Sequence, residues 1–385
     1  MVLVARGELT RTLAGKSATW TYTFGKGTDN LLSGCDLPSH LYSFSFNLNP
    51  NWSKELCDQP EILQCKPPSE PRCALPIATI SDELSDMEDT VDKFDLRKHV
   101  QASVECLGAK WHNDKGKWEI QLKDLKKGVE YSRFSSVFVS AVGAISFPRD
   151  VVFKGMQSFK GPMFHTARWN HSVNYKGKRV AVIGNGCSAA QVVPALARGG
   201  AAFVKQYARS AQWYHPRPNH QFTELEKWAF RWIPFWQRWL RLQIFLAADE
   251  QTTTYFPTPK GLKARVAAEK ESSEYIRSKA PEKYHDFIVP KFPLGCKRRI
   301  FDPDYLESLN YPNVELLNHG IQEINETGII SSGGIFDQFD IIVLATGFQV
   351  AQFLTPMNII GSHGASLDQQ SVENSLSLSP KKQRG

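Results

Sequence analysis

The chain has 385 residues, of which 42% are hydrophobic and 22% charged, and its formal net charge at pH 7 is +7. This length allows one large or two medium domains with a buried core, and the hydrophobic fraction is ordinary for a globular protein. The mild excess of Lys and Arg suits an anionic small ligand as well as it suits nucleic acid. Arginines do not alternate with aromatic residues along the chain, so we expect no nucleic-acid partner.

The seven cysteines indicate a reducing compartment. Their number is odd and no C-x-x-C pair occurs, which is typical of free thiols rather than of a disulfide framework or a zinc site. The N-terminus also lacks the charged and apolar regions of a signal peptide. We therefore expect a cytoplasmic protein without a bound metal.

The first third of the chain has a mixed pattern. Residues 1–34 form an atypical segment without a familiar motif. Residues 65–89 are rich in proline and then in acidic side chains, which indicates an irregular insertion. Residues 115–122 alternate apolar with polar side chains, the period of a half-buried strand.

A β-α-β unit is predicted over residues 179–208. The apolar run 179–183 predicts a strand, residues 188–198 a helix closed by two glycines, and residues 202–207 a second strand. Helical periodicity then continues over about 223–287. Residues 340–348 form another apolar run, which predicts a further buried strand.

The turn of the β-α-β unit resembles a dinucleotide-binding fingerprint, G-x-G-x-x-A, starting at Gly184. Gly184 allows the tight turn, Gly186 lets a pyrophosphate approach the backbone, and Ala189 keeps the helix close to the strand. Ser188 stands at the helix N-terminus, whose free N–H groups bind phosphate. An ordinary β-α turn with two glycines is the alternative interpretation.

The end of the second strand predicts the choice of cofactor. Proteins that bind NAD place an acid about twenty residues after the glycines, but this chain has Lys205, Arg209 and Ser210 there. A cation and a hydroxyl suit a ribose 2′-phosphate, so NADPH is predicted in preference to NADH. Solvated surface bases are the alternative.

Aromatic residues are concentrated between residues 228 and 247. Arg231, Arg238 and Arg241 interrupt this stretch, and each would cost about 2.5–3.5 kcal/mol in a bilayer core. We expect an amphipathic helix pair on or in a soluble protein, and a role at a membrane surface is the alternative. The aromatic side chains are expected to pack in the core of the helical insertion; they are Trp228, Phe230, Trp232, Phe235, Trp236 and Trp239.

One further motif lies just upstream of the glycine turn. It is F-x-G-x-x-x-H-x-x-x-W, formed by Phe159, Gly161, His165 and Trp169. Followed by the fingerprint, it resembles the signature of Baeyer–Villiger monooxygenases, flavoenzymes that use NADPH and dioxygen to convert ketones into esters or lactones. The resemblance implies that this segment connects two nucleotide-binding domains and serves positioning and domain motion rather than proton transfer.

The resemblance also implies residues for the flavin and for catalysis. Arg298 would be the catalytic cation and Asp36 the carboxylate that orients it, because the reactive oxygen species of this chemistry is an anion. Lys297 would be a second contact to the NADP phosphate. The implied contacts to FAD are Thr19, Trp20, Tyr42, Thr346 and Gly347.

The expected fold class is α/β, with a doubly wound, Rossmann-like NADP-binding domain and an incomplete Rossmann-like FAD-binding domain. The NADP-binding domain would span 151–335 with the helical insertion at about 223–287. The partial FAD-binding domain would span 35–150 and return at 336–370, before a disordered tail at 371–385. Cofactors would be FAD and NADPH, and partners a small-molecule ketone and dioxygen.

The sequence departs from the family pattern in places, and these differences leave alternative functions open. No G-x-G-x-x-G turn for the FAD pyrophosphate precedes Asp36, so we expect weak flavin binding by the chain as written. One alternative is a related flavin monooxygenase that hydroxylates nitrogen or sulfur. Another is a catalytically impaired remnant that binds NADP. The ketone, a secondary-metabolite role and the oligomeric state are not determined by the sequence.

Overall fold

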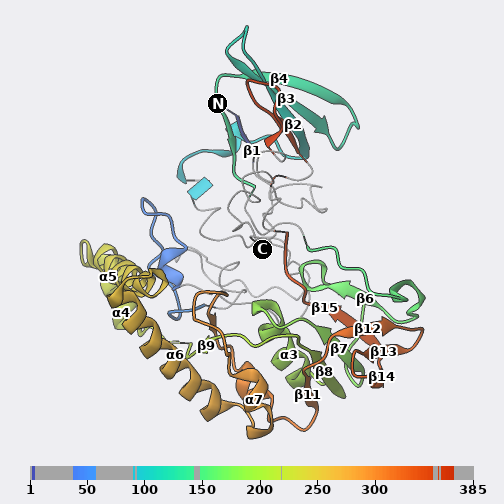
Figure 1. Cartoon of the computed structure of the whole chain (residues 1–385). Helices are drawn as coiled ribbons and strands as arrows, with labels where there is room; N and C mark the ends of the chain where they lie inside the picture. Colours follow the sequence, from blue (N-terminus) through green and yellow to red (C-terminus); the bar gives the residue numbers. More distant parts are fainter. Residues whose placement is uncertain are drawn as a thin grey trace, which may run out of the picture. The chain divides into compact units, whose positions relative to one another are not determined.

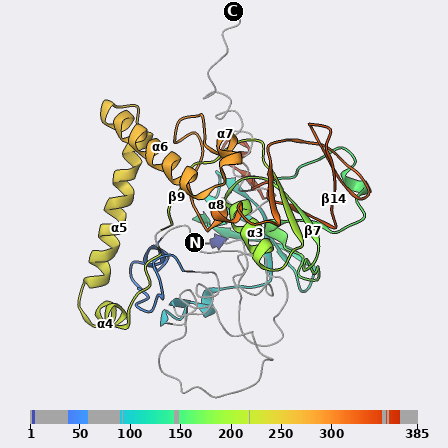
Figure 2. The same cartoon turned by 90° about the horizontal axis from the view of Figure 1, so that it is seen from below.

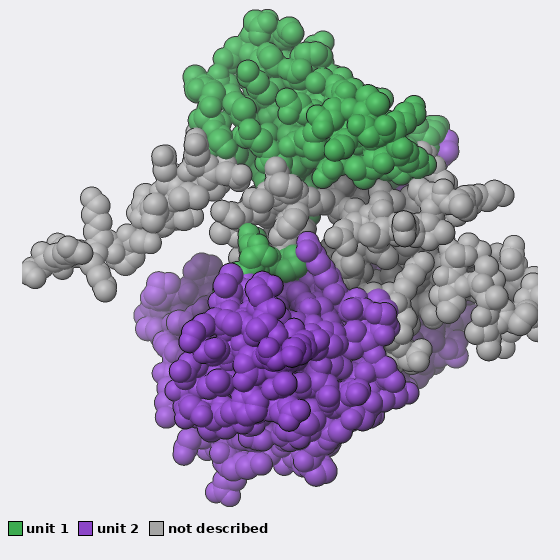
Figure 3. Space-filling model, turned by 90° about the vertical axis from the view of Figure 1, so that its right-hand side faces the viewer, with its two compact units in different colours: residues 1–22, 96–150, 348–385 green, residues 23–95, 151–347 purple. Residues whose placement is uncertain are grey.

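The structure, a computed structural model, describes residues 2–4, 38–57, 90–91, 93–142, 148–217, 219–349, 354 and 357–367 (Figure 1). The expectations for residues 5–34, 65–89 and 371–385 lie outside these ranges. The chain divides into two compact units, which Figure 3 shows in different colours. The first unit comprises residues 1–22, 96–150 and 348–385, and the second comprises residues 23–95 and 151–347.

The two compact units can be compared with the predicted domains. The predicted NADP-binding domain, 151–335, lies within the second unit. Residues 38–57 also belong to the second unit, whereas residues 96–142 belong to the first. The assignment of 35–150 to a single flavin-binding domain stays a prediction.

The core of the second unit is a five-stranded parallel sheet in the order β11-β8-β7-β15-β6. Its strands are β6 (Met163–His165), β7 (Arg179–Ile183), β8 (Phe203–Tyr207), β11 (Val314–Leu317) and β15 (Ile341–Leu344). The central strands β7 and β15 are rich in Val and Ile because both faces of the sheet are covered. The strands predicted at 179–183, 202–207 and 340–348 are confirmed, the last two in shorter form.

Successive side chains of β7 point to opposite faces of the sheet. Val180 and Val182 belong to the hydrophobic cluster on the face covered by α3 (Cys187–Arg198). Ala181 and Ile183 belong to the cluster on the other face. That cluster includes side chains from an antiparallel sheet of β12 (Ile321–Ile324), β13 (Gly328–Ser331) and β14 (Phe336–Gln338). The expected α/β class with a Rossmann-like sheet is confirmed.

The helical insertion is confirmed at the predicted place. Its helices are α4 (Glu224–Trp232), α5 (Trp236–Thr252), α6 (Pro259–Lys279) and α7 (His285–Ile288). Thr223 and Glu226 form a capping box, which fixes the start of α4. Figure 2 shows α5 running between α4 and α6 at the edge of the second unit.

The expectation that the aromatic side chains of this insertion form a core is wrong for most of them. Between 42% and 73% of the surface is exposed for Trp228, Trp232, Phe235, Trp236 and Trp239. Only Phe230 is buried, where its ring contacts His40 and Phe222.

The physical reason is that α5 is attached to the second unit by polar contacts. Gln237 is its one buried residue, and its amide donates to the Asn49 carbonyl over 2.5 Å. The Arg241 guanidinium donates to the carbonyls of His40 and Ser43. Of the helices in the described ranges, none is long and apolar enough to cross a membrane.

The first unit contains a four-stranded sheet in the order β16-β2-β3-β4. Its strands are β2 (Val104–His112), β3 (Lys117–Asp124), β4 (Glu130–Ser135) and β16 (Asn358–Ile360). The strand predicted at 115–122 is thus confirmed as β3. Ile120, Leu122 and Ile359 form part of the core of this sheet. A parallel pair is formed by β1 (Val2–Val4) and β5 (Phe138–Ser140).

Candidate nucleotide and active site

The glycine turn after β7 has the geometry that its sequence predicts. Gly184 has a φ of +135°, a conformation that side chains rarely adopt. A Cβ on Gly184 would lie 2.1 Å from the Ala345 carbonyl oxygen. On Gly186 it would meet open space, since no atom lies within 4 Å. Gly186 is the N-cap of α3, so this space faces the helix end that attracts a phosphate.

The neighbouring residues of the fingerprint also lie where predicted. Ser188 is half-buried in the first turn of α3, and Ala189 is fully buried against the sheet. The small side chain of Ala189 lets α3 pack close to β7. The described residues around this turn therefore fit a dinucleotide pyrophosphate.

The end of β8 brings together three residues that the sequence analysis assigned to NADPH. The Lys297 ammonium donates to the Ser210 hydroxyl over 2.5 Å and to the Ala211 carbonyl over 3.1 Å. Burial, and then the nearby Arg209 guanidinium, lower the pKa of Lys297. Two cations held this close favour an anion between them.

A pocket of about 430 Å³ opens beside these residues. Its lining includes Arg209, Ser210, Lys291, Phe292 and one carboxylate, Asp286. The Lys297 ammonium lies 5.0 Å from the centre of the Phe292 ring, which supports its position. The chemistry of this pocket suits a ribose phosphate with an apolar ring system beside it.

Lys205 does not belong to this site, contrary to the expectation. Its ammonium is buried and forms ion pairs with Asp337 at 2.8 Å and Glu315 at 3.1 Å. Asp337 also accepts a hydrogen bond from the Tyr207 hydroxyl. Alternation along β8 places Lys205 on the face of the sheet where Asp337 of β14 lies, so its charge is used within the fold.

Replacing Lys205 by Met should lower the free energy of unfolding by about 2 kcal/mol, because the partly buried carboxylate of Asp337 loses its cationic hydrogen-bond donor. NADPH affinity should stay within twofold of the parent value. Urea denaturation and a fluorescence titration with NADPH measure the two quantities. Lys260→Met, at an exposed position of α6, is the control. A large loss of affinity would return Lys205 to the site.

Arg298 lines a second cavity, of about 240 Å³, within the second unit. Two further arginines, Arg217 and Arg299, line it too, together with His215 and Cys187. No carboxylate is among the described residues that line it. Asp36, the predicted partner of Arg298, lies outside the described residues.

Arg299 is held by a buried histidine. Its guanidinium donates to Nδ1 of His215 over 2.9 Å. Burial and then the Arg299 charge lower the pKa of His215 to about 3, so the imidazole is neutral and can accept. The cavity is thus cationic at neutral pH. Arg217 and Arg299 were not predicted from the sequence, since only the fold brings Arg217 beside the segment that follows Lys297.

The signature segment contains the edge strand β6. A Cβ on Gly161 would lie 2.3 Å from the Asp340 carbonyl oxygen, so glycine is required at this contact. The Phe164 and Trp169 rings pack edge to face at 4.9 Å. Phe159 packs against the sheet. These contacts fit the implied positioning role.

His165 lies at the end of β6, opposite Leu344 in the register. Its Nδ1 accepts a hydrogen bond from the Ala167 backbone. Burial lowers its pKa, and a hydrogen bond to the Gly347 backbone opposes this effect. A neutral imidazole in this setting caps the following turn.

Three of the residues assigned to FAD are described. Tyr42 is exposed at the end of a short 3-10 helix, Ser39–Leu41. Gly347 has a φ of +82° and follows β15. The hydroxyl of Thr346 is buried without a hydrogen-bond partner among the described residues. An orphaned hydroxyl beside a glycine turn fits a flavin contact; Thr19 and Trp20 lie outside the described residues.

The fold and the site define a class: a parallel α/β sheet whose glycine turn and cationic strand end suit a dinucleotide. Residues 80–222 match the model of the flavin-binding monooxygenase-like family. The chain is 31% identical over 353 residues to the FAD-binding monooxygenase ktnD of Aspergillus niger, covering 89% of this chain and 54% of that protein. It is 29% identical to a Baeyer–Villiger monooxygenase of Streptomyces coelicolor, covering 89% of this chain and 61% of that protein.

Comparison with solved structures gives the same class of protein. An oxidized steroid monooxygenase bound to NADP is similar with a TM-score of 0.66 and 26% identity, over 88% of this chain and 67% of that one. Cyclohexanone monooxygenase from Rhodococcus sp. Phi1, bound to NADP+, is similar with a TM-score of 0.67 and 26% identity, over 88% of this chain and 66% of that one. The chain is therefore related, in sequence and in fold, to Baeyer–Villiger-type flavin monooxygenases, as predicted. It spans little more than half the length of ktnD.

Proposed function

We propose that the chain carries the NADPH-binding half of a flavin-dependent monooxygenase that inserts one oxygen atom from dioxygen next to a ketone carbonyl. The observation that carries this proposal is the Lys297–Ser210 contact beside Arg209, next to the glycine turn. The relatedness to Baeyer–Villiger monooxygenases supports the reaction class. A secondary-metabolite ketone and a cytoplasmic location are parts of the same proposal.

Each part of the site has a role in this proposal. When bound, NADPH supplies a hydride and FAD the redox centre that activates dioxygen. The end of α3 and Gly186 hold the pyrophosphate. Arg209, Ser210 and Lys297 hold the 2′-phosphate. Arg298 stabilises the negative charge that develops during oxygen transfer, because a guanidinium is a fixed cation with several N–H donors.

The test of the cofactor site is Arg209→Ala. NADPH binding should weaken by about 1.5–3 kcal/mol, the scale of a hydrogen bond to a charged group, while NADH binding should hardly change. Isothermal calorimetry with both cofactors measures this. Arg238→Ala, an exposed arginine on α5, should leave both affinities unchanged. Equal NADPH and NADH affinities in the parent protein would remove the basis of the proposal.

Two alternatives from the sequence are separated by further measurements. Flavin absorbance of the desalted protein after incubation with FAD distinguishes a flavoprotein from an NADP-binding remnant. Mass spectrometry of products from ketones, amines and sulfides distinguishes ester formation from hydroxylation of nitrogen or sulfur. The three cationic side chains of the Arg298 cavity favour ester formation, which develops the greater negative charge.

A further inference from the structure

A buried chain of hydrogen bonds begins at Tyr305, in the short helix α8 (Tyr305–Ser308). The Tyr305 hydroxyl donates to the Gln206 side-chain oxygen over 2.7 Å. The Gln206 amide in turn donates to the Gly184 carbonyl over 2.8 Å and to Oδ1 of Asn185 over 3.2 Å. Tyr305 and Gln206 are both completely buried. A core side chain from β8 therefore holds the backbone of the glycine turn.

Asn185 carries this chain of hydrogen bonds to the end of β8. Its Nδ2 donates to the Ser210 carbonyl over 2.7 Å, and its Oδ1 also accepts from the Tyr214 hydroxyl over 3.4 Å. Ser210 is the residue whose hydroxyl accepts from Lys297. One side chain thus joins the turn that faces the pyrophosphate to the residue that faces the 2′-phosphate. Asn185 stands at the variable position of the fingerprint, which assigns it no role.

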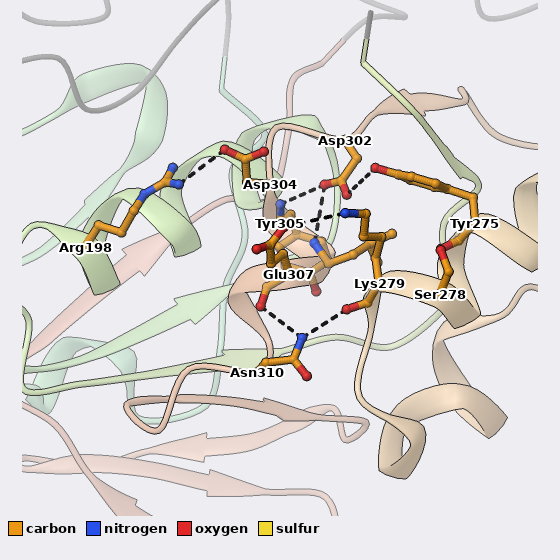
Figure 4. Close-up of polar contacts among 10 residues, drawn as sticks. Arg198, Tyr275, Ser278, Lys279, Asp302, Asp304, Tyr305, Glu307 and Asn310 are labelled. Carbon is orange, nitrogen blue, oxygen red and sulfur yellow. Dashed lines mark hydrogen bonds and ion pairs between the residues drawn. The ribbon is translucent and has the colours of Figure 1, made fainter.

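The segment that carries Tyr305, the first donor of this series of hydrogen bonds, is held by several polar contacts, as Figure 4 shows. Asp302 accepts from the backbone N–H groups of Tyr305 and Leu306, at 2.7 and 3.3 Å. The Tyr275 hydroxyl from α6 donates to the same carboxylate over 3.0 Å. At the end of α3, Arg198 pairs with Asp304 at 3.2 Å. The helix that carries Tyr305 is therefore fixed to two other elements, which gives its hydroxyl a set position.

We propose that Asn185 is a positioning residue that determines the preference for NADPH over NADH. It holds the Ser210 backbone at a fixed place relative to the glycine turn, so that the Ser210 hydroxyl and Lys297 meet a 2′-phosphate while the turn holds the pyrophosphate. The proposal rests on the proposed function of the site. Loss of Asn185 frees the Ser210 backbone, and the proposed cofactor contact of Ser210 is the 2′-phosphate, which NADH lacks.

The test compares cofactor affinities of Asn185→Ala with the parent by calorimetry. The dissociation constant for NADPH should rise roughly five- to tenfold, the effect of about one hydrogen bond, while that for NADH should rise less than twofold. If Asn185 had a purely structural role, its loss would instead weaken the binding of both cofactors equally. An equal loss, or no change in either constant, overturns the proposal.

Two tyrosine variants keep the test decisive if Asn185→Ala folds poorly. Tyr305→Phe removes the first donor and should lower the NADPH preference about two- to threefold. Tyr207→Phe removes a buried hydroxyl from β8, the strand that carries Gln206. This hydroxyl donates to Asp337 on the other side of the sheet, so the variant should leave the preference unchanged. The same loss of preference in both variants overturns the proposal. If the parent itself binds NADPH no better than NADH, the proposed function fails instead.

Discussion

Arg298→Ala should reduce ester formation by roughly two to three orders of magnitude, the usual effect of removing a preorganised group that stabilises developing negative charge. NADPH oxidation should persist in part, because Arg298 lies in its own cavity and not in the pocket that holds Arg209 and Ser210. The measurement is product analysis by mass spectrometry with cyclic and aryl ketones, on protein supplied with FAD and NADPH. NADPH consumption is followed in the same reactions by absorbance.

Two further variants make this prediction specific. Arg298→Lys keeps the positive charge and should recover part of the ester yield, though not all, since ammonium lacks the planar fork of guanidinium. Arg277→Ala, an exposed arginine on α6, should behave like the parent. Asp36→Ala should act in the same direction as Arg298→Ala but more weakly. A normal ester yield from Arg298→Ala would exclude the assigned role.

Gly184→Ala should lower the free energy of unfolding by about 3 kcal/mol or more. The new Cβ would lie 2.1 Å from the Ala345 carbonyl oxygen, and the φ of +135° disfavours any side chain. Relief would require β7 and β15 to separate, although they are paired along Ile341 to Leu344. Urea denaturation of the protein without cofactor measures this loss.

Gly186→Ala is the matched control. A Cβ at Gly184 would clash within the fold, whereas a Cβ at Gly186 would obstruct only a bound ligand. Its Cβ would meet open space, so the stability should change by less than about 1 kcal/mol. NADPH affinity should nonetheless fall at least tenfold, since the methyl group would occupy the approach of the pyrophosphate. Two equally unstable variants, or an unchanged NADPH affinity in Gly186→Ala, would show that the turn does not serve this ligand.

Much of the second unit could be predicted because its signals are local. The strand β7, the turn at Gly184 and the helix α3 follow from consecutive residues whose periodicity and backbone preferences agree. The antiparallel sheet of β12–β14 was not predicted. Its strands are short, and they gain stability by packing against the face of the parallel sheet opposite α3.

By itself, the sequence determined the dinucleotide turn, the cationic end of β8 and the family resemblance, because each depends on residues at fixed, short spacing. The tertiary structure decided which charges serve the site. Lys297 reaches Ser210 across 87 residues of chain, whereas Lys205, four residues from Arg209, turns into the fold and pairs with Asp337. It also left most aromatic residues of α4 and α5 exposed, whereas Phe230 is buried. Side-chain direction and long-range pairing depend on packing, which no local pattern contains.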